Sequence, residues 1–427
     1  MKSLLICISL LAASNATAGE FIIKFKNPIN QKSLLSLKTL NANFKSTIPK
    51  LNMVVVTSDT LKSGVVPKAL ENEIEYIAKN GKIYLDSAKG DAWQNEASML
   101  WGMEAVKLKK AWNITKGDKS VVVAVSDTGT YLNHSDLSGN LWINKGESGL
   151  DANGKDKAKN KKDDDGNGYV DDVYGYNFET NTSTPNENHY HGTHVAGTVG
   201  GVGGNGGIVG VAGKVSLMTV KFISASGEGT DEAAINTIVY ASDNGARAIN
   251  CSWGSDEYSE PLYDAIVYAQ KKGVLIIAAA GNDGHNHDKY EHYPSGYDLD
   301  NIITVAATTS SNGLLAGFSN YGVETVDLAA PGERIRSSFN VMYNTLYCGT
   351  SGMSHFYCEL SGTSMAAPHV TGAVAMVYAV NPKLTYKEAK AIILSTVAPS
   401  KHLKGKVITG GQLDVNAAVI KAKATLN

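Results

Sequence analysis

The chain has 427 residues, which is enough for two or three domains of ordinary size. Hydrophobic residues make up 43% of it and charged residues 19%, a composition that supports a large core. The formal net charge is only −2, which argues against nucleic acid or an anionic membrane surface as a partner.

The N-terminus has the pattern of an export signal. Lys2 is followed by an apolar run from Leu4 to Ala13 and then by the small-x-small sequence Ala16-Thr17-Ala18. The run is too short to span a bilayer, and no later segment reaches eighteen uninterrupted apolar residues. We predict a signal peptide over 1–18 and a soluble, secreted protein, extracellular or periplasmic. The alternative is a buried first strand.

Residues 19–94 have the pattern of a small α+β unit. Strands are predicted at 20–26, 51–57 and within 74–85, and short helices at 34–40 and 67–73.

From about residue 101 the pattern changes to apolar strands that alternate with helices. Val121 to Val125 is an unbroken β-branched run, typical of a parallel strand covered on both faces. Similar runs occur at 217–223, 246–250, 274–280 and 302–306, and helices are predicted at 191–200, 230–243, 260–271, 364–379 and 385–396. This alternation predicts a doubly wound α/β sheet with functional loops at the carboxyl ends of its strands.

Three segments carry residues suited to acyl transfer. Asp127 ends a strand in VVVAVSDTG, His191 begins a helix in HGTHVAG, and Ser364 begins another in GTSMAAPHVTG. Acyl transfer needs a nucleophile, a base that takes its proton and a carboxylate that orients the base. A turn aspartate, a packed histidine and a helix-capping serine are the alternatives for each residue alone, but they do not explain the set.

These motifs resemble the subtilisin-like serine protease (subtilase) family, and the resemblance runs from residue 101 to residue 415. It implies a three-layer, doubly wound, mostly parallel sheet in a catalytic domain over 95–427. It also implies a ferredoxin-like, inhibitor-like propeptide over 19–94. In the family pattern Ser364 is the nucleophile, His191 the base and Asp127 the orienting carboxylate.

The resemblance also implies a fourth catalytic residue and a peptide-binding cleft. Asn282, in LIIAAAGND, matches the asparagine that donates its amide to the oxyanion, and the alternative is a turn asparagine beside Gly281. Two glycine-bearing segments match the edges that hold an extended peptide, although both are also plausible plain turns. The predicted substrate-binding residues are Gly227, Gly229, Ser252, Trp253 and Gly254.

The primary pocket is predicted to be polar, with Asp283 and His292 at its base. The histidines of this region, His285, His287 and His292, raise metal binding as an alternative. Histidines that are close in sequence within a polar loop are usually solvated, so we expect no metal there.

A calcium site is predicted in the acidic segment KKDDDGNGYVDDVYG, where oxygen ligands alternate along a glycine-bearing loop. It is not a full EF-hand loop, because no glutamate holds the twelfth position, and a solvated acidic loop is the alternative. A second calcium site of the family is matched by Asp136 and only loosely by the loop around Asn205. The predicted ligands of the first site are Asp163, Asp165, Asn167, the carbonyl of Tyr169, and Asp171 or Asp172, of which we select Asp172.

The four cysteines divide into three groups. Cys7 belongs to the signal peptide, and Cys348 and Cys358 are expected to form a disulfide in an oxidising compartment, unless they are two unrelated buried thiols. Cys251 adjoins the predicted substrate wall, where it either fills the core or tunes the site.

The function predicted from these residues is a secreted serine endopeptidase that hydrolyses extended protein segments through an acyl-enzyme. It is made as a zymogen whose propeptide is a transient inhibitor and is cut within DSAKGDAWQNEAS, by the enzyme itself. The expected partners are protein or peptide substrates, and the protein is expected to be a monomer. The alternatives are a selective processing protease and an inactive homologue that only binds.

Overall fold

The computed structural model describes residues 18–86, 100–203, 207–311, 313–340, 342 and 356–426. The chain divides into two compact units, Met1–Asn80 and Gly81–Asn427, which are described separately. The predicted signal peptide lies, up to residue 17, outside the described residues. Within the described segments, no helix has both the length and the apolar character needed to cross a bilayer.

The first unit is a four-stranded antiparallel sheet with one helix. Its strands are β1 (Gly19–Phe25), β2 (Asn43–Ile48), β3 (Met53–Ser58) and β4 (Ile74–Lys79), in the order β2-β3-β1-β4, and α1 (Gln31–Thr39) connects β1 to β2. This is the strand order expected of a ferredoxin-like unit. The second expected helix is only a 3₁₀ turn (Lys68–Leu70), in which Leu70 alone is buried, so the segment has too little apolar surface for a longer helix.

The second unit is built on a nine-stranded sheet in the order β17-β18-β14-β13-β12-β10-β6-β8-β7, parallel except for β17 against β18. The prediction of a doubly wound, mostly parallel sheet is confirmed. The strands are β6 (Gly117–Asp127), β7 (Gly175–Asn177), β8 (Lys214–Lys221), β10 (Ala248–Cys251), β12 (Leu275–Ala279), β13 (Ile302–Thr308), β14 (Leu328–Pro331), β17 (Ala398–Pro399) and β18 (Gly411–Gln412).

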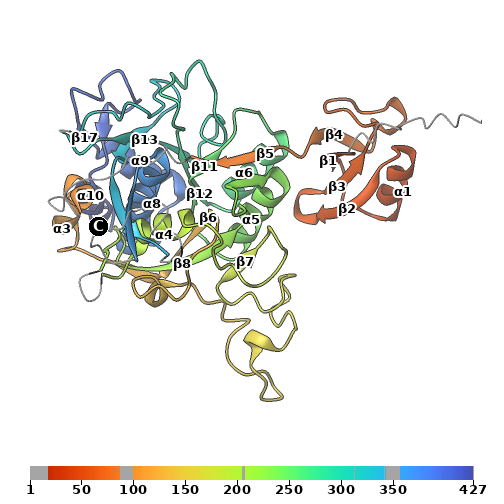
Figure 1. Cartoon of the computed structure of the whole chain (residues 1–427), viewed down its shortest axis with the longest axis horizontal. Helices are drawn as coiled ribbons and strands as arrows, with labels where there is room; N and C mark the ends of the chain where they lie inside the picture. Colours follow the sequence, from red (N-terminus) through yellow and green to blue (C-terminus); the bar gives the residue numbers. More distant parts are fainter. Residues whose placement is uncertain are drawn as a thin grey trace, which may run out of the picture. The chain divides into compact units, whose positions relative to one another are not determined.

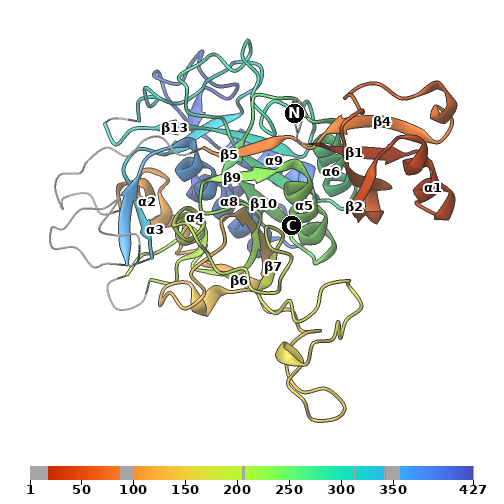
Figure 2. The same cartoon turned by 45° about the vertical axis from the view of Figure 1, so that its right-hand side comes forward.

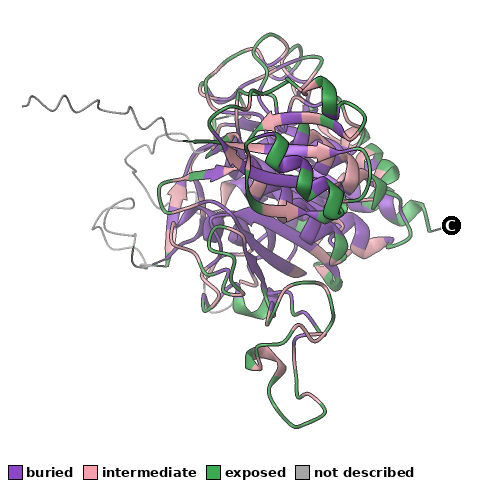
Figure 3. Ribbon diagram, turned by 90° about the vertical axis from the view of Figure 1, so that its right-hand side faces the viewer, coloured by how far each residue is buried: buried purple, intermediate pink, exposed green. Residues whose placement is uncertain are grey.

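Helices cover both faces of this sheet (Figure 1). On one face, α8 packs across five strands and against α4, and on the other, α5 packs on β6 and β8 while α6 packs on β12. Because both faces are covered, the central strands β10, β12, β13 and β14 are buried along their whole length (Figure 3), which explains their apolar sequences. The helices are α2 (Trp101–Ala105), α3 (Leu108–Ala111), α4 (His191–Gly200), α5 (Asp231–Asp243), α6 (Glu260–Lys271), α8 (Thr363–Val380), α9 (Tyr386–Ser395) and α10 (Val415–Ala424).

The strand order reverses at β6, because β8 lies on one side of β6 and β10 on the other. In a doubly wound sheet, the crevice at such a reversal is where ligands bind, at the carboxyl ends of the strands. Two small sheets flank the large one: β15 (Ile335–Ser338) pairs with β16 (Tyr357–Leu360), and β11 (Trp253–Gly254), β5 (Lys82–Leu85) and β9 (Glu228–Thr230) form a three-stranded sheet.

Candidate active site

Asp127 and His191 form a buried pair where β6 ends and α4 begins. The Nδ1 atom of His191 lies 2.9 and 3.0 Å from the two carboxylate oxygens of Asp127, and both side chains are fully buried. The next residue, Gly192, has no room for a side chain, since a Cβ would lie 2.1 Å from the carbonyl oxygen of Gly129. The close approach of the helix start to the strand end therefore depends on this glycine.

This pairing fixes the chemistry of the imidazole. A proton on Nδ1 is donated to the carboxylate, so Nε2 of the neutral ring carries a lone pair. The Nε2 atom of His191 is buried and has no hydrogen-bond partner within the described part of the chain. An oriented acceptor without a partner is what a general base requires.

The second histidine of the HGTHVAG motif, His194, has a structural role. The Nε2 atom of His194 lies 2.9 Å from the carbonyl oxygen of Ile335 and 3.2 Å from that of Cys358. Burial lowers the pKa of His194 to about 3, so the ring is neutral and ties α4 to strands β15 and β16.

Ser364 lies at the start of α8, at the same edge of the large sheet. Its hydroxyl donates to the carbonyl oxygen of Ser252 at 2.9 Å, and the Ser252 hydroxyl donates to the carbonyl of Ser364 at 2.9 Å. Ser252 directly follows β10, whose last residue, Cys251, pairs with Ser126 of β6, so Ser252 lies beside Asp127. In this structure the Ser364 hydroxyl is thus bonded to Ser252 and not to His191.

Asn282 follows β12 and presents its amide to the same region. Its Oδ1 atom accepts the Thr363 backbone N–H at 2.9 Å, which sets the direction of the amide, and its Nδ2 atom donates to the carbonyl oxygen of Asp86. Thr363 immediately precedes Ser364. A carbonyl group is therefore held by the Asn282 donor next to the Ser364 hydroxyl, as an oxyanion site requires.

The five residues predicted to bind substrate border residues 82–86. Strand β5 lies between β9 and β11 and is antiparallel to both (β11 is labelled in Figure 1 and β9 in Figure 2). Its registers pair Ile83 with Gly229, Tyr84 with Gly254 and Leu85 with Trp253, while the N–H groups of Leu85 and Asp86 donate to the carbonyls of Gly227 and Ser252. Residues 82–86 of the chain thus lie between the two segments that hold the predicted substrate-binding residues.

A family model described as the subtilase family matches residues 118–414, more than half of the chain. The chain belongs to the subtilase family. The thermophilic serine proteinase of Bacillus sp. (strain AK1) is 32% identical over 369 residues, 84% of this chain and 77% of that protein. Subtilisin-like protease 1 of Plasmodium berghei (strain Anka) is 31% identical over 379 residues, 84% of this chain and 59% of its own length.

Among solved structures, fervidolysin from Fervidobacterium pennivorans, described as a keratinolytic enzyme related to subtilisin, matches this subtilase with a TM-score of 0.71 and 25% identity. The match covers 95% of this chain and 61% of fervidolysin. This subtilase therefore spans about three fifths of two of the relatives that it matches, and the subtilisin-like fold expected from the sequence is confirmed.

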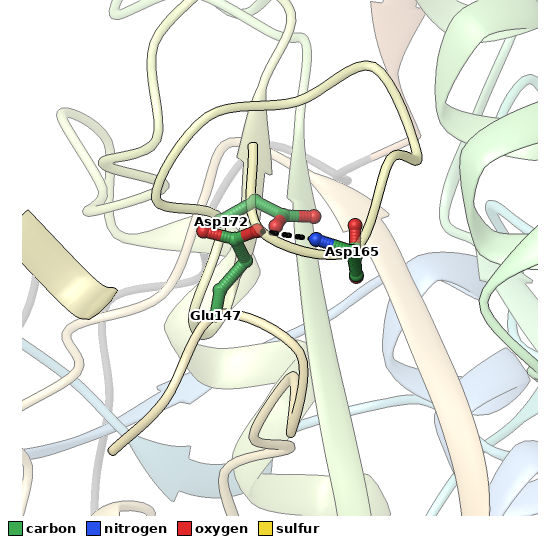
Figure 4. A group of neighbouring side chains, drawn as sticks. All are labelled: Glu147, Asp165 and Asp172. Carbon is green, nitrogen blue, oxygen red and sulfur yellow. Dashed lines mark hydrogen bonds between the residues drawn. The ribbon is translucent and has the colours of Figure 1, made fainter. Parts of the chain in front are cut away.

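The predicted calcium loop of this subtilase forms an acidic group with one member that the sequence did not suggest. Carboxylate oxygens of Glu147, Asp165 and Asp172 lie within 4.8 Å of one another (Figure 4). Glu147 and Asp172 are buried, and burial raises the pKa of Asp172 to about 6. Two buried carboxylates beside a third are the donor set that a hard dication prefers, so the residues fit calcium.

The other predicted ligands have different contacts. The carboxylate of Asp163 accepts the backbone N–H groups of Gly166, Asn167 and Gly168. The Asn167 amide donates to Asp172 at 3.0 Å, and the ring of Tyr169 packs against Tyr176, Phe178 and Tyr240. Glu147 was not predicted as a ligand because it precedes the acidic loop in the sequence and has no acidic residues next to it.

The remaining predictions concern the primary pocket, the cysteines and the second calcium site. His292 contacts the Asp86 side chain, whereas Asp283 is exposed. Cys251 is a fully buried free thiol in β10. Cys348 and Asn205 lie outside the described residues, so the disulfide to Cys358 and the second calcium site stay predictions, although Asp136 is buried and accepts the Ile208 N–H at 2.8 Å.

Proposed function

We propose that this subtilase is a serine endopeptidase that hydrolyses extended peptide segments through an acyl-enzyme. One observation carries the proposal: the Ser252 carbonyl accepts both the Ser364 hydroxyl, at 2.9 Å, and the N–H of Asp86, at 3.3 Å. A peptide in this cleft thus has the nucleophile beside the residue whose carbonyl faces Asn282.

The chemistry follows from these positions. The Ser364 oxygen bonds to the carbonyl carbon of the peptide while its proton passes to Nε2 of His191. Asp127 stabilises the imidazolium, and Asn282 stabilises the oxyanion. The C–N bond breaks as the proton moves to the leaving amine, and water then hydrolyses the ester and restores the Ser364 hydroxyl.

We propose further that the chain is a precursor in which the N-terminal region is a propeptide and a transient inhibitor. Support comes from β5, since residues 82–86 hold both edges of the cleft and exclude another peptide. Ser364 would make the cut that releases this segment. The apolar run before Ala18 supports export and secretion, and calcium is proposed as a structural ion at Glu147, Asp165 and Asp172.

Active-serine labelling tests the proposal. A peptidyl phosphonate should modify wild-type protein at Ser364 alone, and Ser364→Ala should remain full length and unlabelled. Ser400→Ala, a substitution outside the cleft, is the matched control and should behave as wild type. If folded wild-type protein takes no label and hydrolyses no peptide, the inactive-homologue alternative replaces this one.

The narrower alternative, a processing protease with few substrates, is favoured by one observation. The subsite that receives the side chain of Asp86 contains a buried histidine rather than an apolar wall. Such a site rejects most side chains and so restricts the sequences that are cut.

A further inference from the structure

The side chain of Asp86 is buried against a histidine on the far side of the cleft. Nε2 of His292 lies 3.1 and 3.2 Å from the two carboxylate oxygens of Asp86, although the residues are 206 positions apart. Nδ1 of the same ring lies 2.9 Å from a carboxylate oxygen of Asp256. Because both ring nitrogens face carboxylates, both must be donors, and the ring is an imidazolium.

The surroundings hold the imidazole in this position. A Cβ on Gly254 would lie 2.1 Å from Nε2 of His292, so only glycine in this wall leaves space for the ring. Ser255 and Tyr293 exchange backbone hydrogen bonds of 2.9 and 2.8 Å, and the Ser295 hydroxyl donates to the His292 carbonyl at 2.9 Å. These hydrogen bonds fix the backbone around His292 and thereby the position of its ring.

Charge supports the same conclusion. Burial by itself lowers the pKa of His292, but the carboxylates of Asp86 and Asp256 outweigh it and raise the pKa to about 10. The contribution of Asp256 is weaker than its distance suggests, since its side chain is 82% exposed. Asp86, which is itself buried, is the main counter-charge.

We propose that this histidine makes the primary subsite selective for an acidic side chain, aspartate above all, and that the precursor is cut at the bond after Asp86. The primary subsite is defined here by Gly254, Asp256 and His292. This inference rests on the proposed endopeptidase function and names its substrate class.

Other side chains lack the complementary charge. A leucine would leave the imidazolium without its buried counter-charge, with only the exposed Asp256 as partner, and a lysine would bring a second positive charge. An asparagine keeps the shape of aspartate but not its charge. A glutamate keeps the charge but carries one more methylene into a space that the Asp86 carboxylate already spans.

The cut is an ordinary hydrolysis in which atoms balance. The Ser364 oxygen bonds to the carbonyl carbon of Asp86, the bond to the nitrogen of residue 87 breaks, and His191 transfers the Ser364 proton to that nitrogen. One water molecule then hydrolyses the ester. The products are a propeptide ending in the Asp86 carboxylate and an enzyme whose first residue is 87.

The test uses mature enzyme and internally quenched peptides that carry Lys-Ile-Tyr-Leu-X, the sequence of residues 82–86 with X at the last position. We expect kcat/KM for X = Asp to exceed that for Asn or Leu by about 10- to 100-fold, the range for a charged hydrogen bond. Equal or faster cleavage after Leu would overturn this inference and leave the endopeptidase proposal standing. No cleavage of any peptide and no phosphonate label would overturn both.

His292→Gln provides the variant test, with His285→Gln as the matched control, because His285 is exposed and its ring packs on Tyr290. We expect His292→Gln to lose the preference for Asp over Asn while Ser364 still takes the phosphonate label, and His285→Gln to keep the preference. A folded, labelled His292→Gln enzyme that still prefers Asp would contradict the assignment.

The precursor gives an independent readout. We expect wild-type precursor to yield a first product that begins at residue 87 and Asp86→Leu precursor to be processed at least tenfold more slowly. A first cut at another bond, or equal rates for the two precursors, would overturn the proposed cleavage position.

Discussion

The hydroxyl of Ser364 and the N–H of Asp86 share one acceptor, the carbonyl oxygen of Ser252. A residue bound at the position of Asp86 is thereby aligned with the nucleophile before any bond is made, and its carbonyl oxygen meets the amide of Asn282. For attack, the hydroxyl must rotate from Ser252 toward Nε2 of His191, which has no partner of its own within the described residues. Catalytic hydrogen bonds of this kind often form only when substrate is bound.

Removing the nucleophile should abolish turnover. We expect Ser364→Ala to lower kcat on the order of a millionfold, the loss known for the nucleophile of subtilisin itself. Substrate binding should be nearly unchanged, because β9 and β11 hold the peptide through its main chain. The measurements are single-turnover hydrolysis and peptide affinity; hydrolysis at the wild-type rate would show that another group attacks.

Removing the oxyanion donor should affect the chemical step more than binding. We expect Asn282→Ala to lower kcat by about 10²- to 10³-fold, the loss known for this donor in subtilisin, with little change in KM. Thr363→Val, which removes the hydroxyl 3.3 Å from Oδ1 of Asn282 but keeps the backbone N–H, should cost much less. Equal losses of kcat in the two variants would mean that the Asn282 amide supports the local structure and does not stabilise the oxyanion directly.

Binding of an acidic side chain by His292 should weaken as the pH rises. The groups that face His292 are Asp86, Asp256 and His287, and burial lowers the pKa of His287 to about 4, so His287 is neutral here. The pKa of His292 is raised from the ordinary histidine value of 6.5 to about 10. The ion pair between His292 and an acidic side chain is therefore fully formed below pH 6.5 and is lost as the pH rises toward 10.

A product peptide that ends at Asp86 should therefore inhibit mature enzyme less well at pH 9.5 than at pH 6.5. The matched peptide that ends in asparagine should show no such trend. Inhibition constants for the two peptides across this range are the measurement, and identical pH profiles would exclude His292 as the charged partner.

Calcium should stabilise the enzyme through Glu147 and Asp172. We expect added calcium to raise Tm and chelation to lower it, because an ion that binds only the folded state shifts unfolding by mass action. Glu147→Gln should remove most of this response, whereas Asp151→Asn, in the same loop but outside the acidic group, should retain it. A chelator that leaves Tm unchanged would argue against the site.

Without calcium, the same carboxylates should make stability fall with pH. The pKa of Asp172 is raised to about 6, so the folded state binds the proton more tightly than the unfolded state does. Stability of the ion-free protein should be greatest below the ordinary pKa of an aspartate and decline as the pH rises through about 6. Calorimetry from pH 4 to 7 with and without calcium checks the sign.

The strands of the large sheet were predictable because burial on both faces leaves an apolar sequence signature. The runs at 121–125 and 274–280 lie at β6 and β12, with ends that differ by a few residues. The prediction missed β2, whose sequence NFKSTI is largely exposed, and four short strands of the large sheet: β7, β14, β17 and β18. In such strands, pairing with a neighbouring strand decides the conformation: β2 pairs with β3, and β17 pairs with β18.

The site was predictable where a motif carries the chemistry and unpredictable where two distant segments meet. Asp127 and His191 stand in recognisable segments, and the structure pairs them. The contact between Asp86 and His292 has no local signal, since it depends on β5 entering the cleft and on the missing side chain at Gly254. Glu147 likewise joins the acidic loop only through folding.

The position of β5 has a consequence for when proteolysis begins. While it is in place, β9 and β11 have no free rows of N–H and C=O groups toward the cleft, so neighbouring molecules can be neither bound nor digested. If the segment is released as proposed, β9 and β11 would be left as two unpaired edges, separated by the width of a single extended strand. Under the proposed function, that gap would admit unfolded polypeptides and exclude chains that are already paired in sheets.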